Sequence, residues 1–188
     1  MTIRVRTSPL LTSSIPVFLL ATLMIFSLIP ARAADYRIFL KVSSVFGEST
    51  DPNHLEWSDV IAFEHGLTAG SGAPQFQNFV VYLYVDKSTP HLHVACATGE
   101  HFPELNLEIT PSNNTGTALL KIRLYEVMVT SISMAGDAAN GGSRPIETIK
   151  FIAGRIQWTY NSIGLDGTVK GSTAGCWDIV KNAACQPL

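Results

Sequence analysis

The chain has 188 residues, of which 46% are hydrophobic and only 15% are charged, with 13 basic and 15 acidic side chains. This length predicts one domain with at most a short appendage, and the even spread of apolar residues excludes a disordered protein. The first 33 residues hold three arginines and no acidic residue, so the body carries ten basic and fifteen acidic groups, a net charge of −5. Such a body lacks the positive field that nonspecific binding to nucleic acid requires, so no nucleic-acid partner is expected.

The first 33 residues have the pattern of a cleaved secretory signal peptide. Two arginines precede an uncharged apolar run at Ile15–Ile29, which would span about 22 Å as a helix, short of the roughly 30 Å hydrocarbon core of a membrane. The run ends at Pro30, and the small residues Ala31 and Ala33 stand where signal peptidase requires them. We therefore expect cleavage between Ala33 and Ala34.

Removal of residues 1–33 leaves a single domain at residues 34–188. An uncleaved anchor that extends the apolar run back to Leu10 is the alternative, and we favour cleavage because the run is short and well bounded. No second apolar run in the sequence is long enough to span a membrane. The mature domain is therefore expected in the periplasm or outside the cell, with no membrane partner after signal removal.

Six segments of the body carry apolar residues at every second position, which is the pattern of half-buried strands. In the fifth segment the pattern slips by one residue near Tyr125-Glu126, which is typical of a β-bulge. The six segments are residues 36–43, 56–67, 76–85, 105–109, 120–134 and 146–160. They predict a mainly β protein of antiparallel strands, arranged as a sandwich or a barrel.

One segment, residues 88–98, has helical rather than strand periodicity. It opens with two candidate N-cap residues, Ser88 and Thr89, and Gly99 can end the helix in the left-handed conformation. Its apolar stripe consists of Leu92, Ala95 and Cys96, at positions i, i+3 and i+4. A helix of this length is too short to be stable alone, so the stripe is expected to pack against the sheet.

Four residues that commonly bind zinc fall close together in and after this helix. They are His91, His93, Cys96 and His101. On a helix, however, His91 and His93 point about 200° apart, whereas zinc needs three or four converging ligands. We therefore interpret the histidines as surface residues and Cys96 as a core thiol, and we expect no metal and no other cofactor. A metal-dependent enzyme is the alternative.

Four acidic residues cluster in and after a polar loop at 46–53. They are Glu48, Asp51, Glu56 and Asp59. A pair of carboxylates can catalyse glycoside hydrolysis, but a solvated turn is the simpler interpretation. The chain has no Gly-x-Ser-x-Gly motif, and Gly70-Ser71-Gly72 lacks the lysine of a phosphate-binding loop. The sequence thus predicts an exported β domain that is not an enzyme.

Two segments carry a resemblance to a known family. The first is Gly47-Glu48-Ser49-Thr50-Asp51, followed by His54, and the second is Ala95-Cys96-Ala97-Thr98-Gly99. Shorter matches follow in order, and the last of them is Ala174-Gly175-Cys176-Trp177-Asp178. In their order and spacing these segments resemble haemolysin-coregulated protein, the tube protein of type VI secretion.

The resemblance implies a small antiparallel β-barrel of two sheets with one short α-helix packed beside it. It also implies hexameric rings that stack into a tube, with no catalytic site. The partners it implies are further copies of the chain, the spike protein of the secretion apparatus and small effector cargo in the lumen. The candidate assembly loop is the first matched segment, formed by Gly47, Glu48, Ser49, Thr50 and Asp51.

The signal peptide departs from this family, because its tube-forming members assemble in the cytoplasm. The contrast leaves a second hypothesis open, in which the chain is an exported monomeric β-barrel that serves as a binding module. A smaller departure is His65, which stands where the family often has an aromatic residue.

The three cysteines allow at most one internal disulfide in an oxidising compartment. Cys176 and Cys185 are nine residues apart in a tail that contains glycine and alanine, so the chain can fold back to the Cα separation that a disulfide requires. Cys96 is expected on the inward face of the short helix. We therefore predict a Cys176–Cys185 bridge and a reduced Cys96.

Overall fold

The computed structural model describes residues 36–112, 116–136, 144–164 and 166–187. The expected signal peptide at 1–33 and its cleavage site at Ala33 and Ala34 lie outside these ranges. Among the described residues, no helix is both long enough and apolar enough to cross a membrane.

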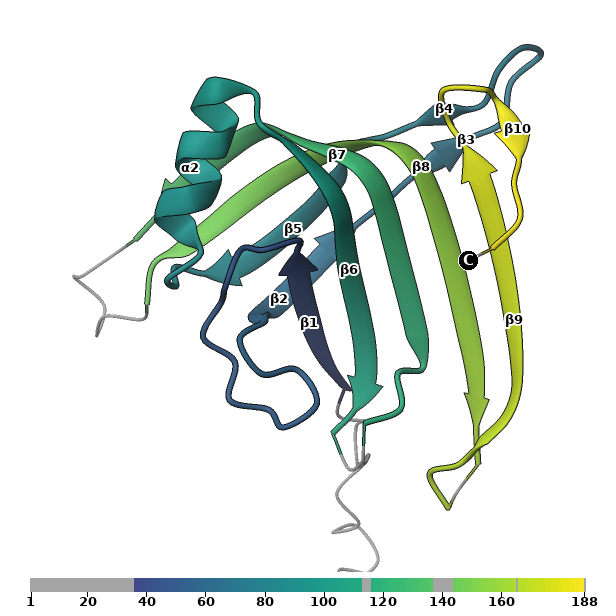
Figure 1. Ribbon diagram of the computed structural model, residues 1–188, viewed down its shortest axis with the longest axis horizontal. Coiled ribbons are helices and arrows are strands. Elements are labelled where there is room, and N and C mark those ends of the chain that lie inside the picture. The colour runs from purple at the N-terminus through teal and green to yellow at the C-terminus, as the bar shows by residue number, and fades with distance from the viewer. Residues whose placement is uncertain (1–35, 113–115, 137–143, 165, 188) are drawn as a thin grey trace, which may run out of the picture. The chain divides into compact units, whose positions relative to one another are not determined.

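The described chain forms a single antiparallel barrel with one helix beside it (Figure 1). The main sheet has the strand order β10-β9-β8-β5-β2-β1-β6-β7, and pairing of β7 with β8 closes six of these strands into a barrel. The strands are β1 (Tyr36–Val42), β2 (Ser58–Glu64), β3 (Leu67–Thr68), β4 (Gln75–Phe76), β5 (Phe79–Tyr84), β6 (His101–Pro111), β7 (Leu120–Ala135), β8 (Ile146–Ile163), β9 (Val169–Asp178) and β10 (Ala183–Ala184), and the helix is α2 (Thr89–Thr98). The predicted fold class is confirmed.

Strand β8 is long enough to belong to two parts of the molecule. Its first residues, Ile146–Phe151, pair with β5 inside the barrel, whereas Arg155–Ile163 pair with β9. On its other edge β8 pairs with β7 from Ile146 to Tyr160. The β8–β9 hairpin therefore continues the sheet beyond the closed barrel (Figure 1). We call this extension, residues 155–164 and 166–178, the wing.

The barrel core is built from the inward side chains of the period-two strands, among them Leu83 of β5, Leu105 of β6 and Ile149 of β8, all fully buried. The phase slip near Tyr125-Glu126 is real, but it is not a register shift. Glu126 has a φ of 53°, yet the β7–β8 pairing keeps its register through this position. The bulge instead lies farther along β7, between Val129 and Ser131, so its predicted position was wrong.

Helix α2 packs on the barrel through the apolar residues of its predicted stripe. Leu92 and Ala95 are buried, Cys96 is half-buried against the core, and Gly99 ends the helix with a φ of 71°. The helix begins where predicted, with Ser88 at the N-cap position, but the Ser88 side chain makes no capping hydrogen bond. Its hydroxyl donates instead to Asp86, ahead of the helix.

Candidate assembly surfaces

The candidate assembly loop is held like an additional strand against the residues that follow it. The backbone N–H of Gly47 donates to Glu56 O over 2.8 Å, and the N–H of Ser49 donates to Trp57 O over 2.8 Å. Burial alternates along it, so Gly47 and Ser49 face inward while Glu48 and Thr50 face solvent. A side chain at Gly47 would place its Cβ 2.4 Å from the Trp57 carbonyl, so only glycine fits there. The loop is thus a fixed surface rather than a loose turn.

The last residue of this loop belongs to a buried ionic cluster centred on His54. The ring of His54 is 2% exposed and stacks on Phe39 with 4.0 Å between ring centroids. Its Nδ1 lies 3.2 Å from Asp51 and its Nε2 lies 3.0 Å from Glu108 of β6. Arg37 and Lys121 pair with the outer oxygens of these carboxylates, over 2.7 and 2.9 Å. The cluster therefore ties the loop to the barrel wall.

The electrostatics of the cluster favour a protonated His54. Burial opposes a positive charge, but the hydrogen bonds to Glu108 and Asp51 outweigh it and raise the pKa of His54 above its usual value. Burial likewise opposes ionisation of Asp51 and Glu108, but their hydrogen bonds with His54 hold the pKa of each carboxyl below its usual value. A doubly donating imidazolium between two carboxylates follows from these directions.

We expect protonated His54 to stabilise the protein fully below about pH 6.5 and to stabilise it less as the pH rises further. Because the folded-state pKa is raised, the contribution of His54 is fully present below the unfolded-state pKa and is lost as the pH rises through the folded-state value. His54→Gln should therefore lower the free energy of unfolding by about 2 kcal/mol in mild acid and by less in mild alkali. Urea unfolding over a pH series measures this difference. The control is His101→Gln at an exposed position, and a loss in His54→Gln that is equal at every pH would contradict the prediction.

The β9 strand of the wing is exposed over most of its length. Seven consecutive residues of β9, Val169–Gly175, are exposed, whereas a strand of a closed barrel buries every second side chain. The free edge of β9 is covered by β10 only at Trp177 and Asp178. Tyr160 on β8, which pairs with Thr173, is 51% exposed. An uncovered edge of this kind is a template for pairing with another chain.

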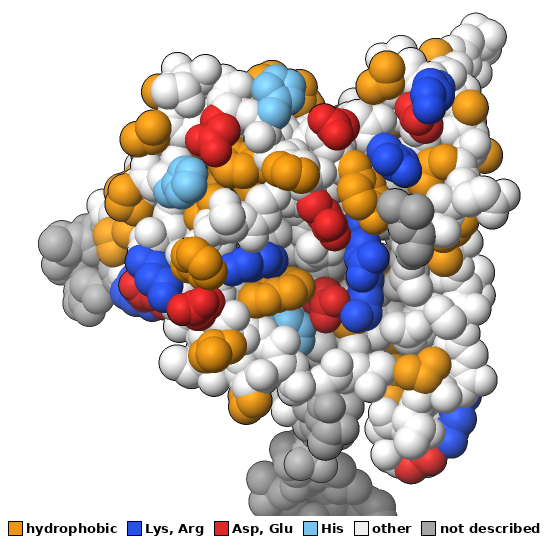
Figure 2. Space-filling model, viewed as in Figure 1, with side chains coloured by type: hydrophobic (Ala, Val, Ile, Leu, Met, Phe, Trp, Pro, Cys, Tyr) orange, Lys and Arg blue, Asp and Glu red, His pale blue; other side chains and the backbone are white. Residues whose placement is uncertain are grey.

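Charged side chains occur on both candidate surfaces. Figure 2 shows acidic and basic side chains interspersed with hydrophobic ones over the face that carries α2 and the 43–57 segment, and further charged side chains at the two ends of the wing. Within the exposed part of β9, Val169–Gly175, the single charged residue is Lys170. Phe46 and Leu55, near the two ends of the 43–57 segment, are 52% and 65% exposed. An edge with few charges loses little solvation energy when a partner covers it, whereas the charged side chains of the other face would need partners across a contact.

The tail beyond the wing folds back onto it through a disulfide. Cys176 and Cys185 are bonded, with their Cα atoms 5.0 Å apart, and the N–H of Cys185 also donates to Cys176 O over 3.1 Å. Cys96 is the unpaired cysteine and is half-buried on α2. The bridge therefore closes a loop that includes β10.

We predict that the exported protein carries this bridge and one free thiol at Cys96. Peptide mapping without reductant should recover Cys176 and Cys185 in one linked peptide pair. Cys185→Ser should then lower the free energy of unfolding by about 2–3 kcal/mol, because closure of so short a loop restricts the unfolded chain only modestly. A disulfide that includes Cys96, or two free thiols in the tail, would overturn the assignment.

The histidines and carboxylates considered from the sequence do not converge on one point. His91 and His93 are about half-exposed, and their nearest carboxylates are Glu100 at 3.6 Å and Glu147 at 3.5 Å. Within the described ranges, no group of three or more histidine, cysteine, aspartate or glutamate side chains is placed to hold a metal ion. The acidic cluster is divided among ion pairs, since Glu48 pairs with Arg144, Asp51 and Asp59 pair with Arg37, and Glu56 lies 3.9 Å from Lys87.

Comparison with known proteins agrees with this geometry. Residues 39–160 match the family described as "Type VI secretion system effector, Hcp". The protein hcp1 of Pseudomonas aeruginosa is 32% identical over 157 residues, which cover 77% of this chain and 96% of that protein. The chain belongs to the Hcp family. In this Hcp chain the matched residues include the candidate assembly loop together with His54, Glu108 and Lys121, whereas β9 and the disulfide lie beyond them.

Solved structures related to this Hcp chain share its fold. A structure titled "Structure of a type six secretion system protein" has a TM-score of 0.74 and 28% identity, and covers 80% of this chain and 100% of its own. Hcp1 from Salmonella typhimurium has a TM-score of 0.69 at 22% identity, with the same coverage, which shows the fold alone. The barrel of the described residues is thus an Hcp barrel.

One buried group in this Hcp chain was not singled out from its sequence. Glu147 is completely buried, and Thr89 donates to its Oε1 over 2.8 Å. Burial raises the pKa of this carboxyl. Thr89 therefore links the start of α2 to β8 instead of capping the helix. The sequence showed a threonine at the start of the helix, but no local pattern predicts that its hydroxyl bonds to a carboxylate 58 residues away.

Proposed function

We propose that this Hcp chain is exported and self-assembles into rings of six copies, which stack as elements of a tube. The chain belongs to a family of structural tube proteins, which supports assembly rather than catalysis. The main support for assembly is the wing. Seven consecutive residues of its β9 strand are exposed and the strand edge is uncovered, and a protein that stays monomeric usually protects such an edge against pairing with other chains.

Ring formation requires two different surfaces on each copy. In a heterologous interface the wing of one copy contacts a different part of the next copy, and such contacts form a ring when the rotation between successive copies closes. We assign the second surface to the candidate assembly loop, because it is fixed by backbone hydrogen bonds and by the His54 cluster. A rigid surface of this kind loses little conformational entropy on association.

The proposed partners follow from the ring. Further copies of the chain form the ring and its stack, the spike protein of a secretion apparatus sits at the end of the stack, and small effector cargo occupies the lumen. The function is non-catalytic and needs no cofactor or metal. No nucleic-acid partner is proposed, in keeping with the net charge of −5 of the body.

Electron microscopy of the exported protein tests this proposal. Negative-stain images of protein recovered from periplasm or culture fluid should show rings with a central hole and six-fold symmetry, some of them stacked. Uniform single particles of the size of one barrel would instead support the exported monomeric binding module.

Processing of the chain is a separate prediction. We expect the exported protein to begin at Ala34, because the apolar run at Ile15–Ile29 is too short for a stable anchor and is followed by a signal peptidase motif. N-terminal sequencing of the exported protein measures this. An intact Met1 on a membrane-bound form would contradict it.

A further inference from the structure

The free edge of β9 does not by itself define where a second strand pairs with it. All of its residues from Val169 to Gly175 are exposed, and two of them are glycines. In a strand with one buried face, a slip of one residue moves the apolar side chains into solvent, so the register is fixed. A glycine-containing strand that is exposed on both faces lacks this constraint and is prone to slippage. A contact of defined geometry along this edge therefore needs another feature that sets its register.

The tail of the same chain occupies one end of this edge. Strand β10 pairs with β9 in the antiparallel direction, opposite Trp177 and Asp178 (Figure 1). The N–H of Cys185 donates to Cys176 O over 3.1 Å, and the two residues are also joined by the disulfide. Within the described ranges, β10 is the only strand on the outer side of β9. The edge thus accepts a strand, and the tail closes its last three residues to any other strand.

The register of β9 identifies the backbone groups that stay free. The carbonyl of Cys176 points outward, because it accepts from the tail. Outward backbone groups recur at every second residue of a strand, and the β8–β9 pairing has no shift between Ser172 and Cys176. The N–H and C=O of Ser172 and Ala174 therefore point to the open edge, directly before the position that the tail occupies.

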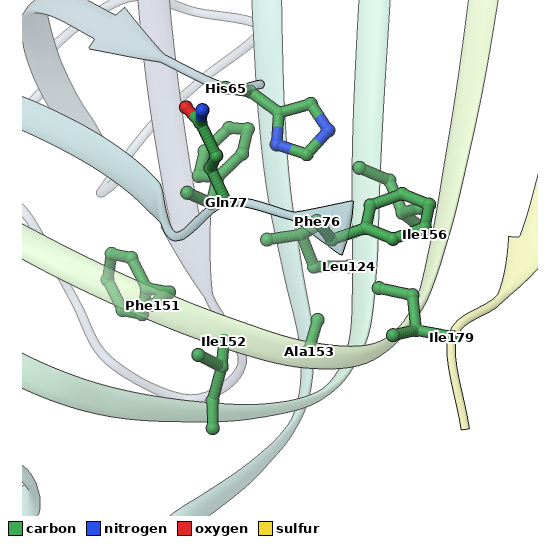
Figure 3. Close-up of a pocket in the computed structure, with 10 residues that line it drawn as sticks. His65, Phe76, Gln77, Leu124, Phe151, Ile152, Ala153, Ile156 and Ile179 are labelled. Carbon is green, nitrogen blue, oxygen red and sulfur yellow. The ribbon is translucent and has the colours of Figure 1, made fainter. Parts of the chain in front are cut away.

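The tail is held in this position by more than the bridge. The N–H of Ile179 donates to Gly154 O of β8 over 2.8 Å. The Ile179 side chain lies in the wall of a cavity of about 110 Å³ at one end of the barrel, together with Leu124 and Ile156 (Figure 3). His65 lines the same cavity. One end of the tail is thus packed on the barrel, and the disulfide fixes the other end to β9.

We propose that the bridged tail is a stop, which ends the pairing edge of β9 at Gly175 and so sets the register in which a strand of a second copy of the chain pairs with Ser172 and Ala174. This inference rests on the proposed self-assembly through the wing, and it adds what aligns the contact. If the tail is released, the outward groups of Cys176 become free, and a partner strand can shift by two residues without changing faces. Copies joined in different registers are related by different rotations, which do not all close into one ring.

The double variant Cys176→Ser/Cys185→Ser tests the stop. Native mass spectrometry of the exported wild type should give one assembled mass, whereas the double variant should assemble into at least two different masses, because its register is no longer limited. Cys96→Ser is the matched control, since it removes the remaining thiol and leaves the bridge intact. It should give the wild-type mass. Circular dichroism establishes that each variant is folded.

Hydrogen exchange at single-residue resolution tests the same claim on the wild type. The single-copy reference is Thr173→Arg, which places a charge in the middle of the edge. In the assembled wild type, the protection factors of the Ser172 and Ala174 amides should be at least about tenfold higher than in this reference. The protection of the Ala183–Cys185 amides should be the same in both. In the double variant the added protection should extend to position 176.

The outcomes separate this inference from the proposed function. A wild type that gives only single copies would overturn both. One identical mass for the wild type and the folded double variant would leave self-assembly in place and exclude the stop. Assembled wild type without added protection at Ser172 and Ala174, or with added protection at Ala183–Cys185, would also exclude the stop, and this result does not depend on whether the double variant folds.

Discussion

Leu92→Asp is expected to unfold the protein. Leu92 is 1% exposed and belongs to the hydrophobic core cluster, so the substitution places a carboxylate among apolar side chains. The buried charge and the lost packing together should lower the free energy of unfolding by more than about 4 kcal/mol. That is a large share of the 5–15 kcal/mol typical of a whole domain. Circular dichroism and urea unfolding measure the loss.

Val94→Asp is the matched control, because it introduces the same side chain two residues away at a position that is 59% exposed. It should change the free energy of unfolding by less than about 0.5 kcal/mol. His91→Ala should also have little effect. Equal losses in the two aspartate variants would contradict the packing of α2, and a loss above about 2 kcal/mol in His91→Ala would revive the metal site.

Thr173→Arg is expected to convert rings into single copies. Thr173 lies in the middle of the exposed part of β9 and pairs with Tyr160, so an arginine there adds a long charged side chain to the proposed interface. Because this position is exposed in the barrel itself, the fold should remain unchanged. Light scattering should report the mass of one copy, and circular dichroism should report an unaltered β spectrum.

Ala97→Arg is the control for this variant, since it adds the same charge at an exposed position of α2, outside both the wing and the candidate assembly loop. It should assemble like the wild type. Rings that persist in Thr173→Arg, or are lost equally in both variants, would exclude the wing as the interface.

The barrel strands could be predicted because each buries one face. In β6, for example, the buried Leu105 and Leu107 alternate with the less buried Asn106 and Glu108, and this alternation is visible in the sequence. Residues 56–67 were assigned as one strand, but β2 ends at Glu64 and β3 is a separate pair of residues. The β6 strand begins at His101, earlier than predicted, because its first four residues do not alternate between apolar and polar side chains.

Strand β9 was missed for a physical reason. Its exposed part, Val169–Gly175, packs on no core, so nothing in its composition selects for alternation. Gly171-Ser172-Thr173-Ala174-Gly175 has the composition of a loop. Its strand conformation comes from pairing with β8, which is a tertiary effect that overrides local propensity.

The candidate site was only partly predictable. The resemblance pointed to the loop and to His54, but Glu108 is 54 residues away, and no local pattern shows that it faces the imidazole. The same holds for His65, whose departure from the family was visible although the cavity around it was not. Contacts between distant segments are fixed by register and barrel closure, which the sequence states only indirectly.

The solution mass of the exported protein tests the central claim most directly. Native mass spectrometry of protein recovered from the periplasm or culture fluid, at micromolar concentration, should give six times the mass of a chain that begins at Ala34. A mass equal to one such chain over the whole concentration range would contradict self-assembly and leave the monomeric binding module as the function.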